Sequence, residues 1–475
     1  MDELVQREPV PAAPGPTDVP PAQRRREQRA WYFYDVANSA YVTTTVTVLL
    51  SPYLTTVAER AACAGSAGSA GSAGSATDCG QDLSVLGLPV SPGSVAFYAA
   101  TFATLLSAVL LPLVGAAVDR SGRQRAVLAG TAWIGSAAAC AMWFVAGTRW
   151  QLGVALLVVA NLCLAASLVT YDSVLCRIAT PDERDQVSSR GWALGYLAGF
   201  VLLAVDLALV TAHDAVGLTE SEAVRWSLLS AGLWWAGFTL VPFLGLRDRP
   251  PVDVPPLRGS LAREAFGQLA TTLRHLRGFP HTLRFLLAYL FFNDGIQTVI
   301  VASSVYGARQ LGFATSQLVV TILVVQLVAF AGALLFGRLA GRYGARDVVL
   351  GSLVMWTAVV ALAFFLPAGR FGLWLALAVL IGLVLGGSQA LSRSLYSQLV
   401  PRGREAEYFS LYQACERGTS WFGTLLFGLV QQVSGSYRPA ILALVLFFVL
   451  GGLLLRRVDV RQGVQDAGNE APAVL

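Results

Sequence analysis

SVAFYAATFATLLSAVLLPLVGAAV, residues 94–118, is a continuous apolar stretch; the basic turn DRSGRQR, residues 119–125, and a second apolar stretch, 126–147, follow it directly. A membrane-spanning helix needs about 20 predominantly apolar residues, so this region predicts two spanning helices joined at the membrane surface. Reading hydropathy outward from it predicts an all-α membrane protein with twelve transmembrane helices. The predicted spans lie near 31–57, 94–118, 126–147, 152–176, 190–211, 227–246, 285–308, 316–337, 347–367, 372–397, 407–432 and 438–456.

The composition agrees with a membrane protein. Of 475 residues, 55% are hydrophobic and 13% are charged, which excludes an ordinary soluble globular chain. The net charge of +5 would suggest nucleic acid binding in a soluble protein. Here most of the 34 basic residues, all of them arginine, fall in segments on the side of the N-terminus. The positive-inside rule then places both termini in the cytosol, and we expect no nucleic acid partner.

The spans divide into two six-helix halves. We expect a cytosolic disordered tail at 1–30, an N-terminal half at 31–246 and a C-terminal half at 285–457, followed by a cytosolic tail at 458–475. The segment 247–284 between the halves is predicted to be a cytosolic linker that contains an amphipathic helix on the membrane surface. That helix is either a regulatory docking site or a passive connection.

The sequence lacks the common motifs of nucleotide-binding and metal sites, and it leaves one possible disulfide open. No G-x-x-x-x-G-K-[ST] or H-E-x-x-H motif occurs, and the chain has only 3 histidines, so we expect no nucleotide cofactor, no metal site and no enzyme activity. Cys63 and Cys79 bracket a GSAG-repeat tract in the first external loop. They either form a disulfide or remain free.

Polar side chains recur inside every third apolar span. An ionisable group at the bilayer centre costs about 2.5–3.5 kcal/mol on insertion scales, so such groups face a protein interior or a wet cavity. Four cavity-facing helices, one in each three-helix unit, are typical of a solute carrier with nested repeats. These residues are Asp35 and Asn38, Asn161 and Asp172, Asn293 and Asp294, and Gln389 and Arg393.

The cytosolic turns repeat between the two halves. GAAVDRSGRQR, residues 115–125, follows the second span, and GRLAGRYGAR, residues 337–346, follows the eighth. Pro181 after the fourth span and Pro401 after the tenth are separated by nearly the same offset. This repetition supports two pseudo-symmetric halves.

These turns also carry a family resemblance. GAAVDRSGRQR resembles the G-x-x-x-D-R-x-G-R-[RK] loop signature of the major facilitator superfamily. YDVANSAY (34–41), RGWALGY (190–196) and GGSQALSRS (386–394) resemble the autophagy-related vacuolar effluxer-like branch. The resemblance implies alternating access by rocking of the two halves about a central site. Its eukaryotic members are linked to export of amino acids from the vacuole, so an amino acid or related metabolite is our first expectation for the substrate.

The resemblance also implies a conformational latch in the first signature loop. In the family the signature aspartate, here Asp119, holds the cytosolic helix ends together in one access state. The second loop has Gly341 where an aspartate would stand, so we expect the C-terminal half to lack an equivalent latch. The predicted latch residues are Gly115, Asp119, Arg120, Gly122 and Arg123.

The candidate substrate and coupling residues allow more than one role. Asp35 and Asn38 share a helix face, where they bind substrate or a cation, or else fix the first helix by a hydrogen bond. Asp294, near the midplane, is our first choice for a protonatable coupling group. Glu416 and Arg417 lie at similar depth in the eleventh span, and we expect one of them to pair with Asp294 or Arg393. A purely structural ion pair is the alternative.

An inter-half gate is predicted from the repeat. Asp172 precedes Pro181, and Arg393 precedes Pro401, by nearly the same number of residues, so an acid and a base lie at near-equivalent depths in the two halves. We expect them to pair when the cytosolic side closes. The alternatives are that Arg393 reaches the headgroups or pairs with Glu416.

Together these features predict a monomeric secondary active transporter in the bacterial plasma membrane. It would move a small polar solute by alternating access through the lipid bilayer, with proton coupling as an option. A transporter-derived receptor or sensor, or a lipid-handling protein without solute flux, is the alternative, because a fold does not fix a function.

Overall fold

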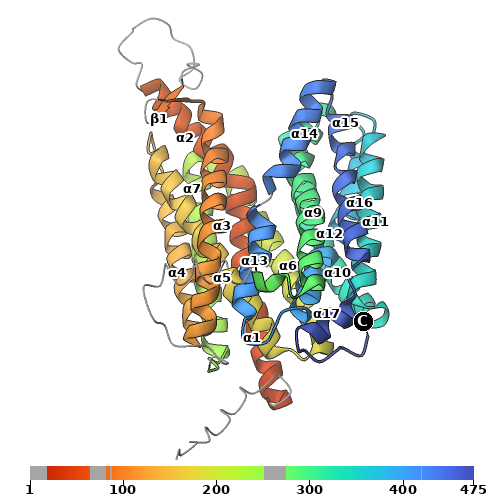
Figure 1. Cartoon of the computed structure of the whole chain (residues 1–475). Coiled ribbons are helices and arrows are strands. Elements are labelled where there is room, and N and C mark those ends of the chain that lie inside the picture. The colour runs from red at the N-terminus through yellow and green to blue at the C-terminus, as the bar shows by residue number, and fades with distance from the viewer. Residues whose placement is uncertain (1–18, 65–81, 86–87, 251–273, 419, 475) are drawn as a thin grey trace, which may run out of the picture.

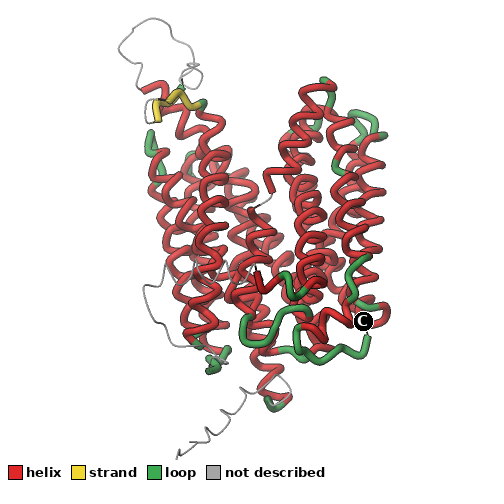
Figure 2. The backbone as a smooth tube through the Cα atoms, viewed as in Figure 1, coloured by secondary structure: helices red, strands yellow, loops and turns green. Residues whose placement is uncertain are grey.

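The architecture comes from a computed structural model that describes residues 19–64, 82–85, 88–250, 274–418 and 420–474. The chain forms two helical bundles that stand side by side (Figures 1 and 2). The first bundle contains α1 (Pro21–Tyr41), the π-helical segment η2 (Val42–Leu49), α2 (Leu50–Ala64), α3 (Val95–Ser121), α4 (Gln124–Ala141), α5 (Trp150–Ile178), α6 (Arg184–Thr211) and α7 (Glu220–Gly245). The second contains α9 (Pro280–Val305), the π-helical segment η7 (Tyr306–Gln310), α10 (Thr315–Tyr343), α11 (Ala345–Phe364), α12 (Phe371–Gln398), α13 (Glu405–Gly418), α14 (Ser420–Ser434), α15 (Tyr437–Ala443), α16 (Val445–Arg456) and α17 (Val460–Asp466).

Short elements connect some of these helices. The strands β1 (Leu83–Val85) and β2 (Leu88–Val90) pair antiparallel, with Leu83 opposite Val90. Single 3-10 turns occupy Pro92–Ser94, Met142–Phe144, Pro181–Glu183 and His213–Val216. The hairpin lies at one end of the bundles, which we call the hairpin face, and α1 begins at the other end, near the C-terminal segment (Figure 1). We call that second end the termini face.

Ten helices in the described part of the chain are long and apolar enough to cross a membrane. The other two predicted spans are also helical in their described residues. The first is made of α1, η2 and α2, and α1 is rich in charged and amide residues. The eleventh comprises α13 and α14, which lie on either side of residue 419, outside the described residues. All twelve predicted spans therefore correspond to helical segments.

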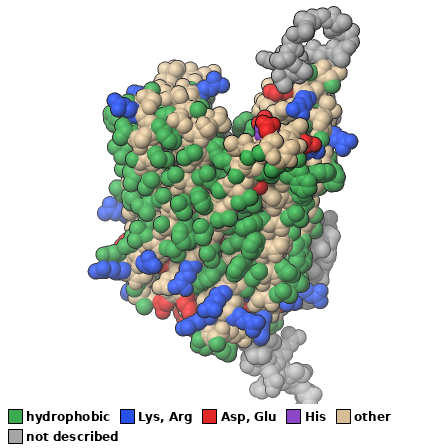
Figure 3. Space-filling model, turned by 180° about the vertical axis from the view of Figure 1, so that it is seen from behind, with side chains coloured by type: hydrophobic (Ala, Val, Ile, Leu, Met, Phe, Trp, Pro, Cys, Tyr) green, Lys and Arg blue, Asp and Glu red, His purple; other side chains and the backbone are tan. Residues whose placement is uncertain are grey.

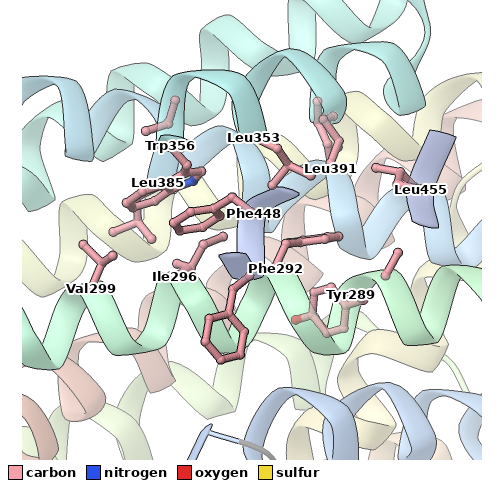
Figure 4. Packing of buried hydrophobic residues seen from close by; sticks show 14 of the residues in the cluster. Tyr289, Phe292, Ile296, Val299, Leu353, Trp356, Leu385, Leu391, Phe448 and Leu455 are labelled. Atoms are coloured by element: carbon pink, nitrogen blue, oxygen red, sulfur yellow. The ribbon is translucent and has the colours of Figure 1, made fainter. Parts of the chain in front are cut away.

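Each bundle has its own hydrophobic core. In the second bundle, Trp356 of α11 stacks on Phe448 of α16 with ring centroids 5.6 Å apart, and Tyr289 and Phe292 of α9 belong to the same buried cluster (Figure 4). A separate cluster around Trp31 and Trp235 fills the first bundle. Two large, separate cores are consistent with halves that move as bodies, because packed interiors resist deformation.

The outer surface is apolar around the middle of the molecule. Large exposed side chains such as Phe97, Ile134, Leu233 and Val354 are each about 60% exposed or more. In Figure 3 hydrophobic side chains cover the middle of this face, and arginines gather towards the termini face. Such a belt is expected where side chains meet lipid rather than water.

The two halves meet near the termini face. There α13 packs on α3 and α5, and α6 packs on α10 and α12. One close approach is at Gly115 of α3, where an added Cβ would lie 2.5 Å from the carbonyl oxygen of Ala406. We call this contact region the seam.

The terminal segments differ from the simple tails that the sequence predicts. The first helix begins at Pro21, before the predicted boundary at residue 31, and Gln28 donates to the carbonyl of Ile178 at 2.9 Å. At the other end, Asn469 donates to the carbonyl oxygens of Gln398 (2.9 Å) and Val400 (2.8 Å). The backbone N–H of Ala473 reaches Asp182 in the first half at 2.7 Å. The C-terminal segment therefore spans the seam.

Two other predictions fall partly or wholly outside the described residues. The core of the predicted amphipathic linker helix, 251–273, lies outside them. Cys63 is disulfide-bonded, and Cys79 lies outside the described residues.

Candidate functional site

A cavity of about 290 Å³ lies between the two halves. It is lined by residues of α1, η2, α5 and α6 from the first half and of α9, α10, α12 and α13 from the second. The space-filling view is hollowed between the two lobes at the hairpin face (Figure 3). Seven of the predicted site residues line the cavity: Asp35, Asn38, Asp172, Gln389, Arg393, Glu416 and Arg417.

Arg393 closes the cavity towards the termini face. Its Nη2 lies 3.1 Å from Oδ2 of Asp35, and its Nη1 lies 3.4 Å from Oδ1 of Asp172. Its Nε donates to the hydroxyl of Ser188 at 2.9 Å. Arg393 and Asp172 are each 2% exposed and Asp35 is 4% exposed. The structure thus brings Asp172 and Arg393 together across the seam, and it adds Asp35, which the repeat did not place in this pair.

Three aromatic rings surround the guanidinium group. The Cζ atom of Arg393 lies 4.8 Å from the ring centroid of Trp31 and 5.3 Å from those of Tyr171 and Trp192. The Tyr171 hydroxyl donates to Asp35 at 2.6 Å, and its ring stacks on Trp31 at 4.3 Å. We call Trp31, Asp35, Tyr171, Asp172, Ser188 and Trp192 the guanidinium cage.

Helical spacing explains how the cage forms. Trp31 and Asp35 are four residues apart on α1, and Ser188 and Trp192 are four apart on α6, so each pair lies on one face of its helix. At Gly191 of α6 an added Cβ would collide with the Asp35 carboxylate. The glycine lets α6 approach α1 closely enough to assemble the cage.

A chain of polar contacts runs from the cage into the cavity through α13. Gln413 donates to Oδ2 of Asp172 at 2.8 Å and to Oε2 of Glu416 at 3.2 Å. The Nε of Arg417 donates back to Gln413 at 3.3 Å. Gln413, Glu416 and Arg417 share one helix face because they are three or four residues apart. This chain connects groups that face the solute space with the charges that close it.

Asn293 and Asp294, the two polar residues of the seventh span, contact different neighbours. Asn293 accepts from Gln389 at 3.0 Å and donates to the carbonyl of Glu416 at 3.2 Å. Asp294 accepts from the backbone N–H of Gly423 at 2.8 Å, in the first turn of α14, and it does not line the cavity. The first choice for a coupling group therefore lies against α14, outside the solute space.

Asn161 is also absent from the cavity lining. It is partly buried on α5. Depth along a span can be read from sequence, but the direction in which a side chain points depends on how the helix is rotated.

Two of the predicted latch residues, Gly115 and Asp119, lie at the seam on the termini face. Asp119 accepts from the backbone N–H groups of Ala406 (3.0 Å) and Glu407 (2.8 Å), which belong to the first turn of α13. Arg177 lies 3.2 Å from Glu405 and 3.9 Å from Asp119. Asp119 thus joins α3 to α13 by using N–H groups that have no partner within the helix.

The remaining residues of the signature loop shape the turn. Gly122 has φ of 61°, in the left-handed region that favours glycine. Arg120 is partly buried, and Arg123 is exposed with its backbone N–H bonded to the Ser121 hydroxyl. In the second half, Gly341 has nothing within 4 Å of an added Cβ, so its neighbourhood is open.

Sequence reasoning missed several residues that the structure places at the site. Ser188, Tyr171, Trp192 and Gln413 contact Arg393, Asp35 or Asp172. None of the first three carries a charge, so none stands out inside an apolar span. Gln413 could have been found, because an amide in a span is also costly to bury without partners.

Comparison with known proteins places this architecture among transporters. A family model described as Vacuole effluxer Atg22 like matches residues 23–468. The chain is 28% identical over 455 residues to the Uncharacterized MFS-type transporter YxiO of Bacillus subtilis (strain 168), covering 94% of this chain and 98% of the relative. It is 25% identical to Autophagy-related protein 22 of Pyricularia oryzae (strain 70-15), covering 95% and 78%.

A solved structure agrees on the fold. The E. coli fucose:proton symporter FucP superposes with a TM-score of 0.65 at 13% identity, covering 92% of this chain and 99% of that one. At this identity the likeness concerns the fold alone. The prediction of a major facilitator fold with two six-helix halves is confirmed.

Proposed function

Because the chain belongs to the vacuole effluxer Atg22-like family of the major facilitator superfamily, we propose that this multi-pass membrane protein is a secondary active transporter for a small polar solute. The observation that carries the proposal is the central cavity, which opens on the hairpin face and ends at the Arg393 ion pairs towards the termini face. A carrier needs a solute site that is reachable from one side while the other side is closed. Separation of the seam and closure of the hairpin face would expose the same site to the opposite compartment.

Orientation follows from the arginine distribution. The positive-inside rule favours a cytosolic termini face, so the described state would open to the outside. We propose that the protein resides in a bacterial plasma membrane and works as a monomer, since each chain contains both halves of the cavity.

The lining supports a polar solute with charged groups. Asp35, Asp172 and Glu416 supply three carboxylates, and Arg393 and Arg417 supply two guanidinium groups. An amino acid presents both an ammonium and a carboxylate, which suits a cavity with both signs of charge. Glu416, which Gln413 connects to Asp172, is the group we assign to proton coupling.

Flux through reconstituted vesicles tests the proposal. The purified protein is placed in liposomes, and uptake of labelled amino acids and related metabolites is measured with and without a pH gradient. We expect saturable uptake of at least one solute, and a tenfold or greater loss in Arg393→Ala. Arg370→Ala, at an exposed arginine between α11 and α12 and outside the cavity lining, controls for nonspecific loss of charge. Binding without flux of any solute would overturn the proposal in favour of a receptor.

A further inference from the structure

The guanidinium cage is built entirely by the first half of the chain, and the cation that fills it comes from the second. Trp31 and Asp35 lie on α1, Tyr171 and Asp172 on α5, and Ser188 and Trp192 on α6, while Arg393 lies on α12. If the two halves part at the seam, Arg393 leaves with α12. The cage residues remain with one another, because Trp31 donates to the carbonyl of Tyr171 at 2.9 Å and the two rings are stacked.

An emptied cage would need another cation. Asp35 and Asp172 are almost fully buried, and each approaches the same guanidinium, so together they would repel one another strongly without it. Three aromatic faces at cation–π distance add attraction for a positively charged organic group, and they offer much less to a strongly hydrated inorganic ion. Two carboxylates with rings around them form a site for a guanidinium or ammonium group.

The same carboxylates border the cavity in the described state. Asp35, Asp172 and Trp192 line the cavity together with Arg393. A solute that enters from the hairpin face therefore meets the edge of the cage while Arg393 still occupies its centre.

We propose that Arg393 is a tethered substitute for the cationic group of the transported solute, and that the cage binds a solute bearing a guanidinium or primary ammonium group when Arg393 withdraws. The proposal rests on the transport function above and narrows its substrate class. It gives the closing step a direct cause: Arg393 re-enters the cage and displaces the solute's cation, so release of solute and closure of the seam happen together.

Chemical rescue of a full-length variant tests the site. Arg393→Ala empties the cage without altering its walls, and methylguanidine serves as the probe. We expect millimolar methylguanidine to raise the melting temperature of Arg393→Ala by several degrees and that of the wild type much less, because a ligand stabilises the state that binds it. Adding Asp172→Asn to Arg393→Ala should remove the effect. Arg417→Ala, which removes a cavity arginine outside the cage, is the matched control and should show no such gain.

Equal stabilisation by sodium chloride at the same ionic strength, or an equal gain in Arg417→Ala, would overturn the proposal. A second measurement covers the case in which Arg393→Ala does not fold. The wild type should bind L-arginine about tenfold more tightly than L-citrulline, which replaces the guanidinium by a neutral group of similar shape. Asp35→Asn should remove that preference, and equal affinity of the wild type for the two solutes would also overturn the proposal. Flux of neutral solutes in the vesicle assay would leave the transport function standing in either case.

Discussion

Arg393 shows how a charge is kept inside a membrane protein. Its guanidinium group has five N–H donors, and contacts with Asp35, Asp172 and both oxygens of Ser188 use them within a shell of aromatic rings. A lysine could not make the same planar set of contacts. The pairing across the seam therefore compensates the buried charge. It also stabilises only the arrangement in which the two halves are closed at the seam.

Charge reversal at the pair should impair transport. Arg393→Asp would place a third carboxylate beside Asp35 and Asp172, and Asp172→Arg would place two cations together, so we expect each to lower solute flux at least tenfold. The double variant Asp172→Arg/Arg393→Asp should recover part of the flux, since opposite charges again face each other. Recovery should be incomplete because Asp35 also contacts Arg393. A double variant no better than the worse single would show that the pair has no role in the cycle.

Proton coupling should depend on Glu416 rather than on Asp294. Glu416→Gln should abolish accumulation driven by a pH gradient but leave solute exchange partly intact, because exchange needs no net proton transfer. Asp294→Asn is the comparison, since the asparagine oxygen can still accept from Gly423 and the residue lies outside the cavity. Both activities are measured in the same vesicles. Loss of gradient-driven accumulation in Asp294→Asn would instead support Asp294 as the proton-coupling group, as its depth in the span predicts.

At the scale of elements, the start of α13 is one of the points where the two halves are joined closely. The Asp119 carboxylate bonds to two N–H groups of its first turn, and Gly115, one helical turn earlier on α3, lies against the same backbone. A change of one side chain here alters the distance between two helices rather than a local contact.

Gly115→Ala should therefore shift the access equilibrium towards separation of the seam. Its Cβ would meet the backbone of Ala406 and Glu407, which cannot move aside as a flexible side chain can. We expect at least a tenfold loss of turnover, as for Asp119→Ala. Gly341→Ala near the end of α10, where the space is open, should change turnover less than twofold. Similar losses from Gly115→Ala and Gly341→Ala in a flux assay would contradict the asymmetry between the halves.

The elements themselves were largely predictable, and the limits of prediction have clear causes. Twelve spans follow from hydropathy because a membrane demands about 20 apolar residues whatever the tertiary contacts are. The early start of α1 has a local signal in Pro21 at its first position, but the bond from Gln28 to Ile178 is tertiary and no local pattern encodes it. The proximity of Asp172 and Arg393 followed from the repeat, whereas the inclusion of Asp35 depends on how α1 is rotated against α5 and α6.

At the scale of the whole molecule, the C-terminal segment connects both halves at the termini face. Asn469 bonds to the end of α12, and the following residues reach Asp182 beyond the seam. Gln398, at the end of α12, in turn donates to the carbonyl of Pro181 at 2.8 Å. The segment thus favours the state in which the halves are closed on this side.

Asn469→Ala should loosen this connection. The loss of two hydrogen bonds is worth about 1–2 kcal/mol, which would shift a two-state equilibrium by roughly five- to thirtyfold. Hydrogen–deuterium exchange is the measurement: backbone amides of α17 and of the end of α12 should exchange faster, and those of α11 should not change. Asn161→Ala, on α5 and away from this segment, is the control. Unchanged exchange in α17 would show that Asn469 does not hold the segment.

The seam also contains a thiol. Cys176 of α5 is 8% exposed, and its Sγ lies 3.7 Å from the carbonyl oxygen of Ser397 on α12. In a chain with Cys140, Cys163 and Cys415 replaced by alanine, a maleimide applied on the termini face should alkylate Cys176 slowly, and only while α5 and α12 are apart. A solute that favours the state open on the hairpin face should slow the reaction, whereas Gly115→Ala should accelerate it. Cys176→Ala supplies the background, and a rate that neither solute nor Gly115→Ala alters would mean that this thiol does not follow the cycle. The alkylation rate of Cys176 would thus report how long the seam stays closed. This residence time could be measured without a fluorophore, a spin label or an antibody.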